Sequence, residues 1–327
     1  MKLSSLPRLL AATLLAASLL SPVSSAAAQQ TMTIGYSVPG LGFPFFAVML
    51  DGAAAAASER GNVSIVPLDG QDRDATQLAG CENALASGIT GLVISPRTVD
   101  GLAGCFSAAQ AAGVPVVTVD RRAATGTPVL AHVGADNVSG GRAAGRFIAD
   151  RLSGKGRLIE LTGTPGASPA IDRSAGFNEV VGQTPGLVVI AQQTANFNAD
   201  DALRVTEDIL TSIGSTPDNP GFEGLFAAND DMVTGAVQAI QARGLDPGQF
   251  TIVGFDALKS ALDLIQQGKL SGTVDQFPNE QAHKAVGVLA DYIQNGTMPE
   301  ADILLLDPKV ISIDNLNDAS TPHKKKQ

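Results

Sequence analysis

Short apolar runs alternate with longer amphipathic segments along most of this chain of 327 residues. The first runs are Met32–Val38, Val63–Pro67, Gly91–Ser95, Val114–Val119 and Val129–Val133, and helix-like stretches such as 75–87 and 100–112 lie between them. Such alternation is typical of an α/β fold with a parallel sheet. Because runs such as Gly91–Ser95 are almost wholly apolar, they predict strands that crossover helices cover on both faces.

The same pattern begins again in the second half of the chain. Its strand candidates are Arg157–Leu161, Leu187–Gln192, Gly224–Ala227, Thr251–Val253 and Ser271–Val274, with helices predicted over Asn137–Leu152 and Ala199–Ile213. Ten strands are too many for one small sheet and suit two sheets of five or six. We therefore expect two α/β lobes of similar architecture. A ligand cleft is expected between them, at the loops that follow the carboxyl ends of the strands.

Charge and hydropathy exclude several classes of protein. The chain has 22 Lys and Arg against 32 Asp and Glu, a formal charge of -10, and no basic stripe before the terminal Lys324–Lys326. A nucleic-acid partner is therefore not expected. Outside the first thirty residues, no apolar run approaches the ~20 residues that span a bilayer. We expect a globular mature protein.

The first residues read as an export signal. Lys2 and Arg8 precede an apolar region over Leu9–Leu20, and small residues follow it. This three-part pattern predicts a secretory signal peptide over 1–28, cleaved after Ala28 or, as an alternative, after Ala27. A membrane anchor is the competing interpretation, but the apolar stretch is short for a bilayer core of ~30 Å.

The two cysteines bear on localisation and on a cross-link. The first is Cys81, deep inside the chain, so no lipid-bearing Cys follows the apolar region. A free exported protein of this kind fits the periplasm of a Gram-negative bacterium. In an oxidising compartment Cys81 can pair with Cys105, because the two helix-like stretches that hold them can lie side by side on one face of a parallel sheet. Two separate buried thiols remain the alternative.

Chemistry in the first half concentrates after two predicted strands. Gly40–Phe46 follows the first strand, but Phe45 stands where a dinucleotide fingerprint needs its third glycine, so a nucleotide is not expected. Phe45 and Phe46 can offer ring faces to a sugar, or can pack in the core. Asp120 and Arg121 follow the fourth strand and match vicinal hydroxyls as acceptor and donor. A surface ion pair is the alternative interpretation.

Comparable polar groups follow strands in the second half. The loop at 163–173 ends in Arg173, Asn229 and Asp231 follow another strand, and Gln276 closes the last one. Asp231 is interpreted as the start of a helix, where acids are favourable. Asp256 is either a helix N-cap or a site residue. Because amide, carboxylate and guanidinium groups converge at equivalent strand ends, we expect one polar binding site.

Enzymatic interpretations find little support. The three histidines share no metal-ligand spacing: His132, His283 and His323. No calcium loop, nucleophile elbow or phosphate-binding loop is evident, so no metal, cofactor or catalytic residue is predicted. Asp120 and Asp256 form in principle a glycosidase pair, but the arginines beside them are expected to keep both ionised and to exclude an acid role. We expect a protein that is not an enzyme.

Taken together, these motifs resemble the periplasmic ribose-binding protein family over about 33–313. The stretches that carry the resemblance are Pro44–Phe46, Thr118–Arg121, Ala135–Val138 with Gly140 and Gly141, Asp172–Arg173, Ala228–Asp230 and Gly254–Asp256. The resemblance implies a type I periplasmic binding protein fold. In that fold two Rossmann-like lobes, each a parallel sheet flanked by helices, are joined by three crossover segments, here near Ala135, Phe277 and Leu306.

The resemblance also implies lobe boundaries and a ligand site. The N-terminal lobe is expected over 31–135 and 278–306, the C-terminal lobe over 136–277 and 307–318, and a flexible tail over 319–327. The ligand-binding residues it implies are Phe45, Phe46, Asp120, Arg121, Arg173, Phe197, Asn229, Asp256 and Gln276. Phe43, Asn137 and Gln71 are further candidates. The hinge glutamine of the family aligns with Phe277, or with Gln276 after a shift of one residue.

Departures from the family pattern bear on the ligand. Phe43 stands where the family has Asn, and Pro39 where it has Ser. Other stretches resemble galactofuranose-binding relatives instead: Gly166–Ser168, Ala170–Arg173, Asn229–Met232 and Gly296–Glu300. The ligand is therefore expected to be a furanose, a pentose or a polyol.

The expected function is capture of this sugar by closure of the two lobes about a hinge and delivery to the permease of an ABC transporter, by a monomer. A periplasmic receptor that presents a sugar or furanose-like autoinducer to a membrane sensor or chemoreceptor is the alternative. A repressor effector domain is opposed by the export signal and by the lack of a basic helix-turn-helix.

Overall fold

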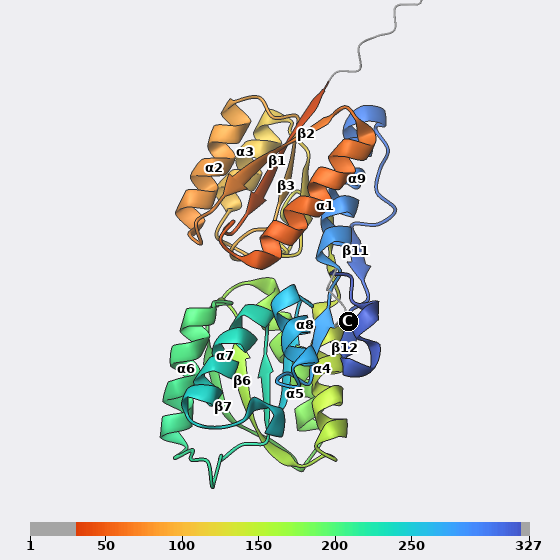
Figure 1. The fold of residues 1–327 in the computed structure, drawn as a ribbon. Helices are drawn as coiled ribbons and strands as arrows, with labels where there is room; N and C mark the ends of the chain where they lie inside the picture. Colours follow the sequence, from red (N-terminus) through yellow and green to blue (C-terminus); the bar gives the residue numbers. More distant parts are fainter. Residues whose placement is uncertain (1–30, 322–327) are drawn as a thin grey trace, which may run out of the picture. The chain divides into compact units, whose positions relative to one another are not determined.

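The computed structural model describes residues 31–321, and within them the chain forms two six-stranded sheets with helices on both faces (Figure 1). The predicted signal peptide lies outside the described residues. Among the residues described, no helix combines the length and apolar character that crossing a membrane requires.

The first sheet has the order β11-β5-β4-β3-β1-β2, and all its neighbouring pairs are parallel. Its strands are β1 (Met32–Val38), β2 (Val63–Asp69), β3 (Gly91–Ile94), β4 (Val116–Val119), β5 (Ala131–Ala135) and β11 (Ile303–Leu306). Helices α1 (Pro44–Arg60) and α9 (Pro278–Asn295) pack on one face, and α2 (Asp74–Ala86) and α3 (Ala103–Ala112) pack on the other. Each face therefore carries its own apolar core.

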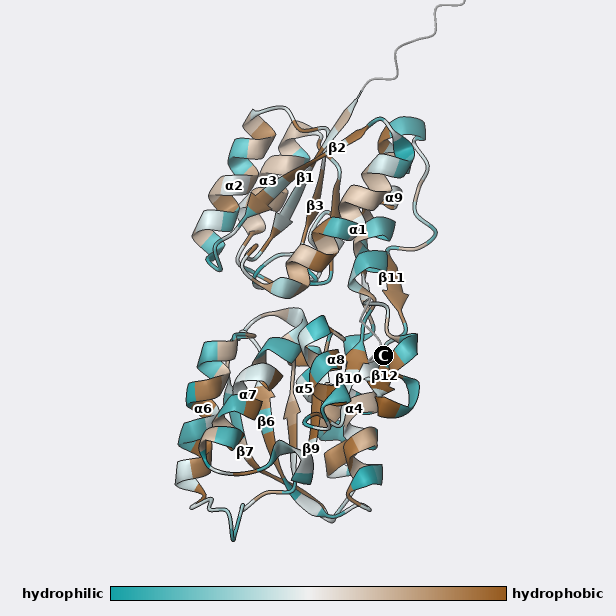
Figure 2. Cartoon of the chain, in the orientation of Figure 1, coloured by the Kyte–Doolittle hydropathy of each residue, from teal (hydrophilic) through white to brown (hydrophobic). Residues whose placement is uncertain are grey.

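The second sheet repeats this arrangement in the order β12-β10-β9-β8-β6-β7. Its strands are β6 (Gly156–Thr162), β7 (Leu187–Thr194), β8 (Gly224–Ala227), β9 (Thr251–Phe255), β10 (Gly272–Asp275) and β12 (Lys309–Ser312). Helices α4 (Asn137–Arg151) and α5 (Ser168–Gly182) cover one face, and α6 (Ala199–Ser212), α7 (Asp230–Ala242) and α8 (Lys259–Gln266) cover the other. Figure 2 shows hydrophobic residues concentrated along the strands of this sheet, as burial on both faces requires.

The ten predicted strands are confirmed, with ends shifted by a few residues, and two further strands complete the sheets. The expected α/β class, with parallel sheets flanked by helices, is confirmed as well. The two further strands, β11 and β12, were not predicted from the sequence; they follow the last long helix and contribute one edge strand to each sheet. The edge strand β12 runs antiparallel to β10, so the second sheet is not wholly parallel.

Helix ends agree with local sequence chemistry where the site begins. Pro44 occupies the first turn of α1, where its missing N–H costs nothing, and Gly61 closes that helix with φ of 71°. The side chain of Asp136 caps α4 by accepting a hydrogen bond from the Ser139 backbone N–H at 2.9 Å. Helix α1 follows β1 after a short loop and α4 follows β5 almost at once, so the first turns of both lie near the carboxyl ends of strands.

A disulfide joins Cys81 on α2 to Cys105 on α3, which confirms the predicted pairing over two free thiols. Both cysteines are fully buried in the apolar cluster between these helices and the first sheet. The two helices lie side by side on one face, as the right-handed crossovers of a parallel sheet allow.

The predicted tail over 319–327 differs from the structure at its beginning. The Ser320 backbone N–H donates to Asp275 Oδ2 at 2.6 Å, its hydroxyl donates to Asp275 Oδ1 at 2.8 Å, and Thr321 is buried. The first residues of this segment are therefore held against the end of β10. The remaining residues, 322–327, lie outside the described part of the chain.

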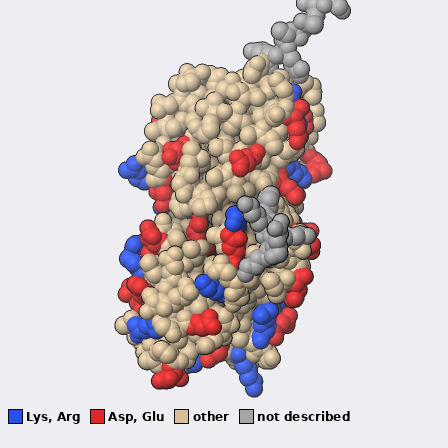
Figure 3. All heavy atoms as spheres, viewed as in Figure 1, with Lys and Arg blue, Asp and Glu red and all other residues tan. Residues whose placement is uncertain are grey.

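On the face drawn in Figure 3, basic and acidic side chains lie interspersed, and neither charge forms a continuous patch. This agrees with the sequence, in which no basic stripe precedes the terminal lysines.

Candidate functional site

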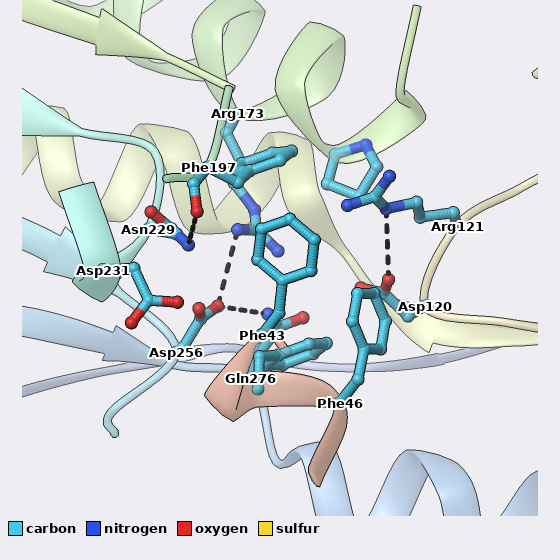
Figure 4. Close-up of a pocket in the computed structure, with 12 residues that line it drawn as sticks. Phe43, Phe46, Asp120, Arg121, Arg173, Phe197, Asn229, Asp231, Asp256 and Gln276 are labelled. Carbon is cyan, nitrogen blue, oxygen red and sulfur yellow. Dashed lines mark hydrogen bonds and ion pairs between the residues drawn. The ribbon is translucent and has the colours of Figure 1, made fainter. Parts of the chain in front are cut away.

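One cavity lies where the carboxyl ends of both sheets meet, and its empty volume is about 330 Å³. Figure 4 shows polar groups and aromatic rings from both lobes converging on it. The lining residues are Phe43, Phe45, Phe46, Asp120, Arg121, Pro169, Arg173, Phe197, Asn229, Asp231, Asp256 and Gln276. This space includes adjoining open solvent, and the residues around it enclose room for one small molecule at most.

Three aromatic rings come from the loop after β1 and the first turn of α1. Phe45 and Phe46 are buried and meet edge to face, with ring centroids 5.2 Å apart. Phe43 is half-buried and meets Phe46 in the same manner at 6.2 Å. Because this loop places adjacent rings at the end of a strand, it gives the cavity an apolar side.

Asp120 and Arg121 form a buried pair directly after β4, so the surface ion pair considered from sequence is wrong. Their exposures are 3% and 5%, and the Arg121 Nε lies 3.7 Å from Asp120 Oδ2. That carboxylate oxygen also accepts a hydrogen bond from the Ser95 hydroxyl at 3.0 Å. The Arg121 Nη1 donates to the Arg97 carbonyl at 2.8 Å, whereas its buried Nε has no hydrogen-bond partner. One donor of this guanidinium is therefore left for a ligand or a water.

The guanidinium of Arg121 also touches aromatic rings from both lobes. It lies 5.5 Å from the ring centroid of Phe46 and 5.3 Å from that of Phe197. These are cation–π distances, which stabilise a desolvated cation. The rings therefore hold this arginine at the cavity while leaving its Nε without a protein acceptor.

The second lobe contributes Arg173, from α5, and Asp256, which follows β9 with φ of 115°. Their closest ion-pair distance is 3.5 Å, and each residue is 2% exposed. Arg173 Nη1 donates to the Ala228 carbonyl at 2.7 Å, and its Nε donates to Asn137 Oδ1 at 2.8 Å. The guanidinium carbon lies 3.8 Å from the ring centroid of Phe255. The planar donor group of Arg173 is therefore fixed on several sides.

Gln276 is oriented by two neighbours at the end of β10. Its Nε2 donates to Asp256 Oδ1 at 2.5 Å, and its Oε1 accepts from Gln281 Nε2 at 3.1 Å. The next residue, Phe277, occupies the N-cap position of α9 and does not line the cavity. Of the two alignments considered from sequence, the geometry brings Gln276 to the cavity.

Phe197 and Asn229 come from the loops after β7 and β8. Phe197 has φ of 58° and is buried, and its carbonyl accepts a hydrogen bond from Asn229 Nδ2 at 3.3 Å. The other amide atom of Asn229 caps α7 by accepting from the Met232 backbone N–H at 3.0 Å. Asp256, by contrast, caps no helix, because α8 begins at Lys259 after Leu258. The N-cap interpretation of Asp256 is therefore wrong.

Burial dominates the electrostatics of the cavity. It raises the pKa of Asp256 to about 8 against the opposing effect of Arg173, and it raises the pKa of Asp120 against Arg121. It lowers the pKa of Arg121 to about 10. The arginines were expected from the sequence to keep both carboxylates ionised; at Asp256 desolvation outweighs the ion pair, and at Asp120 it raises the pKa against the same opposing effect.

Nine of the predicted ligand-binding residues, together with Phe43, lie around this one cavity. Asn137 is buried behind it, where its amide oxygen positions Arg173, and Gln71 is exposed after β2, outside the lining. Two lining residues were not expected at the site: Pro169 was not predicted, and Asp231 was interpreted only as the start of a helix. The sequence does contain a sign of this role, because Asp231 lies two residues after Asn229, close to the end of a strand.

The two lobes also touch at the rim of the cavity. The Arg122 backbone N–H donates to the Ser168 hydroxyl at 2.8 Å, and its guanidinium pairs with Asp172 on α5. The Val99 backbone N–H donates to the Gly166 carbonyl at 3.0 Å. These contacts join loops after β3 and β4 to the loop and helix after β6.

Comparisons with known proteins agree with this geometry. Residues 34–297 match the family model described as a periplasmic binding protein domain. The chain is 36% identical over 289 residues to the ribose import binding protein of Haemophilus influenzae, with 88% of this chain and 94% of that protein covered.

Solved structures extend the comparison to other ligands. A galactofuranose binding protein aligns with a TM-score of 0.82 at 28% identity, over 88% of this chain and 96% of that one. The Caulobacter myo-inositol binding protein, solved with myo-inositol bound, aligns with a TM-score of 0.81 at 33% identity over the same shares of the two chains. The relatives therefore bind ligands of both five and six carbons.

Proposed function

Because this chain belongs to the periplasmic binding protein family, we propose that it captures a monosaccharide or polyol between its lobes and delivers it to an ABC transporter permease. The observation that carries the proposal is the pair of buried arginine–carboxylate sites, Arg121 with Asp120 and Arg173 with Asp256, around a cavity that also has aromatic rings. Such groups complement the hydroxyls and the C–H face of a sugar.

The charge balance favours a neutral ligand. Three lining carboxylates, Asp120, Asp231 and Asp256, stand against two guanidiniums. An acidic sugar would add a further negative charge to a cavity in which burial already disfavours ionised carboxyls. The names of the relatives, which bind ribose, galactofuranose and myo-inositol, support the same class.

We propose that the hinge between the two lobes consists of three segments, near Ala135, Phe277 and Leu306. The ends of β5, β10 and β11 support these positions, because the chain passes there to the other sheet or its helices. The proposed lobes are then 31–135 with 278–306, and 136–277 with 307–318. The rim contacts of Arg122 support closure of one lobe on the other.

A ligand screen tests the binding function. The protein starting at Gln29 is heated with pentoses, hexoses, polyols and a furanose autoinducer, and the titration of each hit is followed by calorimetry. At a hundred times Kd a ligand adds ~2.7 kcal/mol of stability, which shifts the melting temperature by several degrees. No shift with any sugar or polyol contradicts the proposal.

Uptake of the identified ligand tests delivery. Cells that lack this chain should lose uptake of the labelled ligand and regain it with the gene restored. Unchanged uptake together with a lost transcriptional or chemotactic response supports the receptor alternative. In the same cells, mass spectrometry of the periplasmic fraction tests the proposed localisation by asking whether the protein begins at Gln29, and sedimentation of the purified protein tests the proposed monomer.

A further inference from the structure

Asp231 is the one cavity-lining carboxylate with a buried oxygen that has no hydrogen-bond partner among the described residues. Its Oδ2 is shielded from solvent and unpartnered, and the residue lies in the first turn of α7. Asp120 and Asp256, by contrast, accept hydrogen bonds from Ser95 and Gln276. An unpaired buried acceptor is costly, so a ligand donor at this position brings a large gain.

The neighbouring acid shows that helix capping does not explain Asp231. Asp230 is fully buried, and both its oxygens are satisfied, Oδ1 by the Thr273 hydroxyl at 2.7 Å and Oδ2 by the Leu258 backbone N–H at 2.8 Å. Asn229 already caps the helix through Met232. The helix start therefore has its structural groups without Asp231, whose carboxylate faces the cavity (Figure 4).

The position of Asp231 sets the reach that a ligand needs. In Figure 4, Asp231 and Asp256 lie at one end of the cavity, and Asp120 and Arg121 lie at the other. A ligand that pairs only with Asp120 and Asp256 leaves the Asp231 oxygen unpaired. A ligand with one further hydroxyl at the Asp256 end can donate to it.

Resting on the proposed function, we propose that Asp231 is a specificity-determining residue that accepts a hydrogen bond from a sixth-carbon hydroxyl. The protein then prefers six-carbon sugars or cyclitols over five-carbon sugars. No lining cation is left over to pair with Asp231, because Arg173 pairs with Asp256 and Arg121 with Asp120. A neutral hydroxyl donor from the ligand fits this position, and a negatively charged group does not.

Calorimetric titration of two ligand sets tests this inference. The six-carbon set is myo-inositol, D-allose and D-galactose, and the five-carbon set is D-ribose and xylitol. For the unaltered protein we expect the best six-carbon ligand to bind at least tenfold tighter than either five-carbon one. In Asp231→Ala this ligand should lose about 100-fold in affinity, while five-carbon ligands change less than threefold, because a site built to bind a hydroxyl discriminates through it.

Two matched variants separate recognition from structure. Asp231→Asn keeps an acceptor oxygen and should retain part of the preference. Asp200→Ala removes an exposed acid from the first turn of α6, outside the cavity, and should leave every affinity unchanged. The melting temperature of ligand-free Asp231→Ala should stay the same or rise, because an unpaired buried acceptor is removed.

The outcomes distinguish this inference from the proposed function. Tighter binding of a five-carbon sugar by the unaltered protein, or equal losses for both ligand sets in Asp231→Ala, overturns the role of Asp231 while sugar binding stands. A lower melting temperature of Asp231→Ala with an unchanged ratio of affinities assigns the residue to structure. Failure of every sugar and polyol to bind the unaltered protein overturns the proposed function itself.

Discussion

The two lobes share one strand order but bring different chemistry to the same strand ends. After the first strand of each sheet, the N-terminal lobe places Phe45 and Phe46, whereas the C-terminal lobe places Pro169 and Arg173. After the fourth strand the two lobes agree, with Asp120 in one and Asp256 in the other, both at positive φ. The scaffold therefore fixes where side chains emerge, and the residue at each position decides whether a lobe offers ring faces or hydrogen bonds.

This difference predicts that the two lobes contribute differently to ligand binding, which we call their division of labour. The N-terminal lobe supplies most of the apolar surface, and the C-terminal lobe supplies a polar network of Arg173, Asp256, Gln276, Asn229 and Asp231. Stacking tolerates many ring-shaped ligands, whereas directional donors and acceptors discriminate among hydroxyl patterns. We expect losses in the C-terminal network to cost more affinity than losses of rings.

Arg173→Ala should have the largest effect. Removal of the guanidinium takes a fixed donor group from the cavity and leaves Asn137 Oδ1 and the Ala228 carbonyl without their donor, so we expect a loss of about 3 kcal/mol of binding free energy. Calorimetry with the best ligand of the screen measures it. Arg142→Ala removes an exposed arginine of the same lobe, paired with Glu179, and serves as the control. A loss below tenfold in Arg173→Ala contradicts the role assigned to this residue.

The two lobes should also depend differently on covalent cross-linking for their stability, because among the described residues only the N-terminal lobe contains a disulfide. Replacement of both Cys81 and Cys105 by Ser should lower the free energy of unfolding of that lobe by about 3 kcal/mol. Urea denaturation followed by hydrogen exchange measures the two lobes separately. Affinity should be unchanged, since neither cysteine lines the cavity. Equal destabilisation of both lobes would indicate that they unfold as one unit.

The pH dependence tests the buried carboxyl of the C-terminal lobe. Burial raises the pKa of Asp256 to about 8, whereas an unfolded Asp titrates near 3.9, about four pH units lower. Between these values the folded state keeps a proton that the unfolded state releases, so the contribution of Asp256 to stability is full below about pH 4 and is lost as pH rises to about 8. The ligand-free protein should therefore resist urea better at pH 5 than at pH 8.

Asp256→Asn serves as the test variant for this pH effect. The asparagine cannot ionise, so the stability difference between pH 5 and pH 8 should shrink; each tenfold change in the acid constant is worth about 1.4 kcal/mol. Asp120 and Asp231 contribute in the same direction, since burial raises the pKa of both. An identical difference in the variant and the unaltered protein would place the titration elsewhere.

Phe46→Leu probes the apolar side of the comparison. Leucine keeps apolar volume but removes the ring face, and a loss of about 1 kcal/mol, or several-fold in Kd, is expected from aromatic contact alone. Phe197→Leu makes the same change in the C-terminal lobe. Calorimetry with one ligand compares the two, and a loss for Phe46→Leu larger than that for Arg173→Ala would reverse the proposed division of labour.

Arg122→Ala should have the smallest effect. Its guanidinium is 43% exposed, so its pairing with Asp172 is worth about 0 to 1 kcal/mol. The variant removes this rim contact between the lobes without touching the lining. A modest rise in the ligand dissociation rate, measured by stopped-flow fluorescence of a labelled protein, is expected; a tenfold or larger loss of affinity would make the rim a main determinant of binding.

Most residues of this site could be predicted from the sequence, because the apolar runs show where the strands end. Apolar runs located the ten strands, and the polar groups after them, such as Asp120, Asn229 and Gln276, now line one cavity. What it could not supply is the tertiary environment. Asp231 follows the rules of a helix start, and only the packing around α7 leaves its oxygen unpaired. Gln71 also follows a strand, yet its strand is at the sheet edge, away from the cavity.

There is also a physical reason why β11 and β12 could not be predicted from the sequence. Ile303–Leu306 and Lys309–Ser312 are four residues each, and neither is followed by a crossover helix of the repeating pattern. Their pairing partners, β5 and β10, lie far away in the sequence. Alternation along the chain predicts strands between helices, whereas these two depend on long-range pairing.

The exchange of segments between lobes also constrains how the chain can be made. The first sheet lacks β11, and α1 lacks its neighbour α9, until the ribosome has passed residue 306. Because α9 covers the core formed by β1, β3 and β4, the N-terminal lobe cannot complete its packing during most of translation. The lobe whose synthesis begins first can therefore complete its packing only after most of the second lobe has been synthesised.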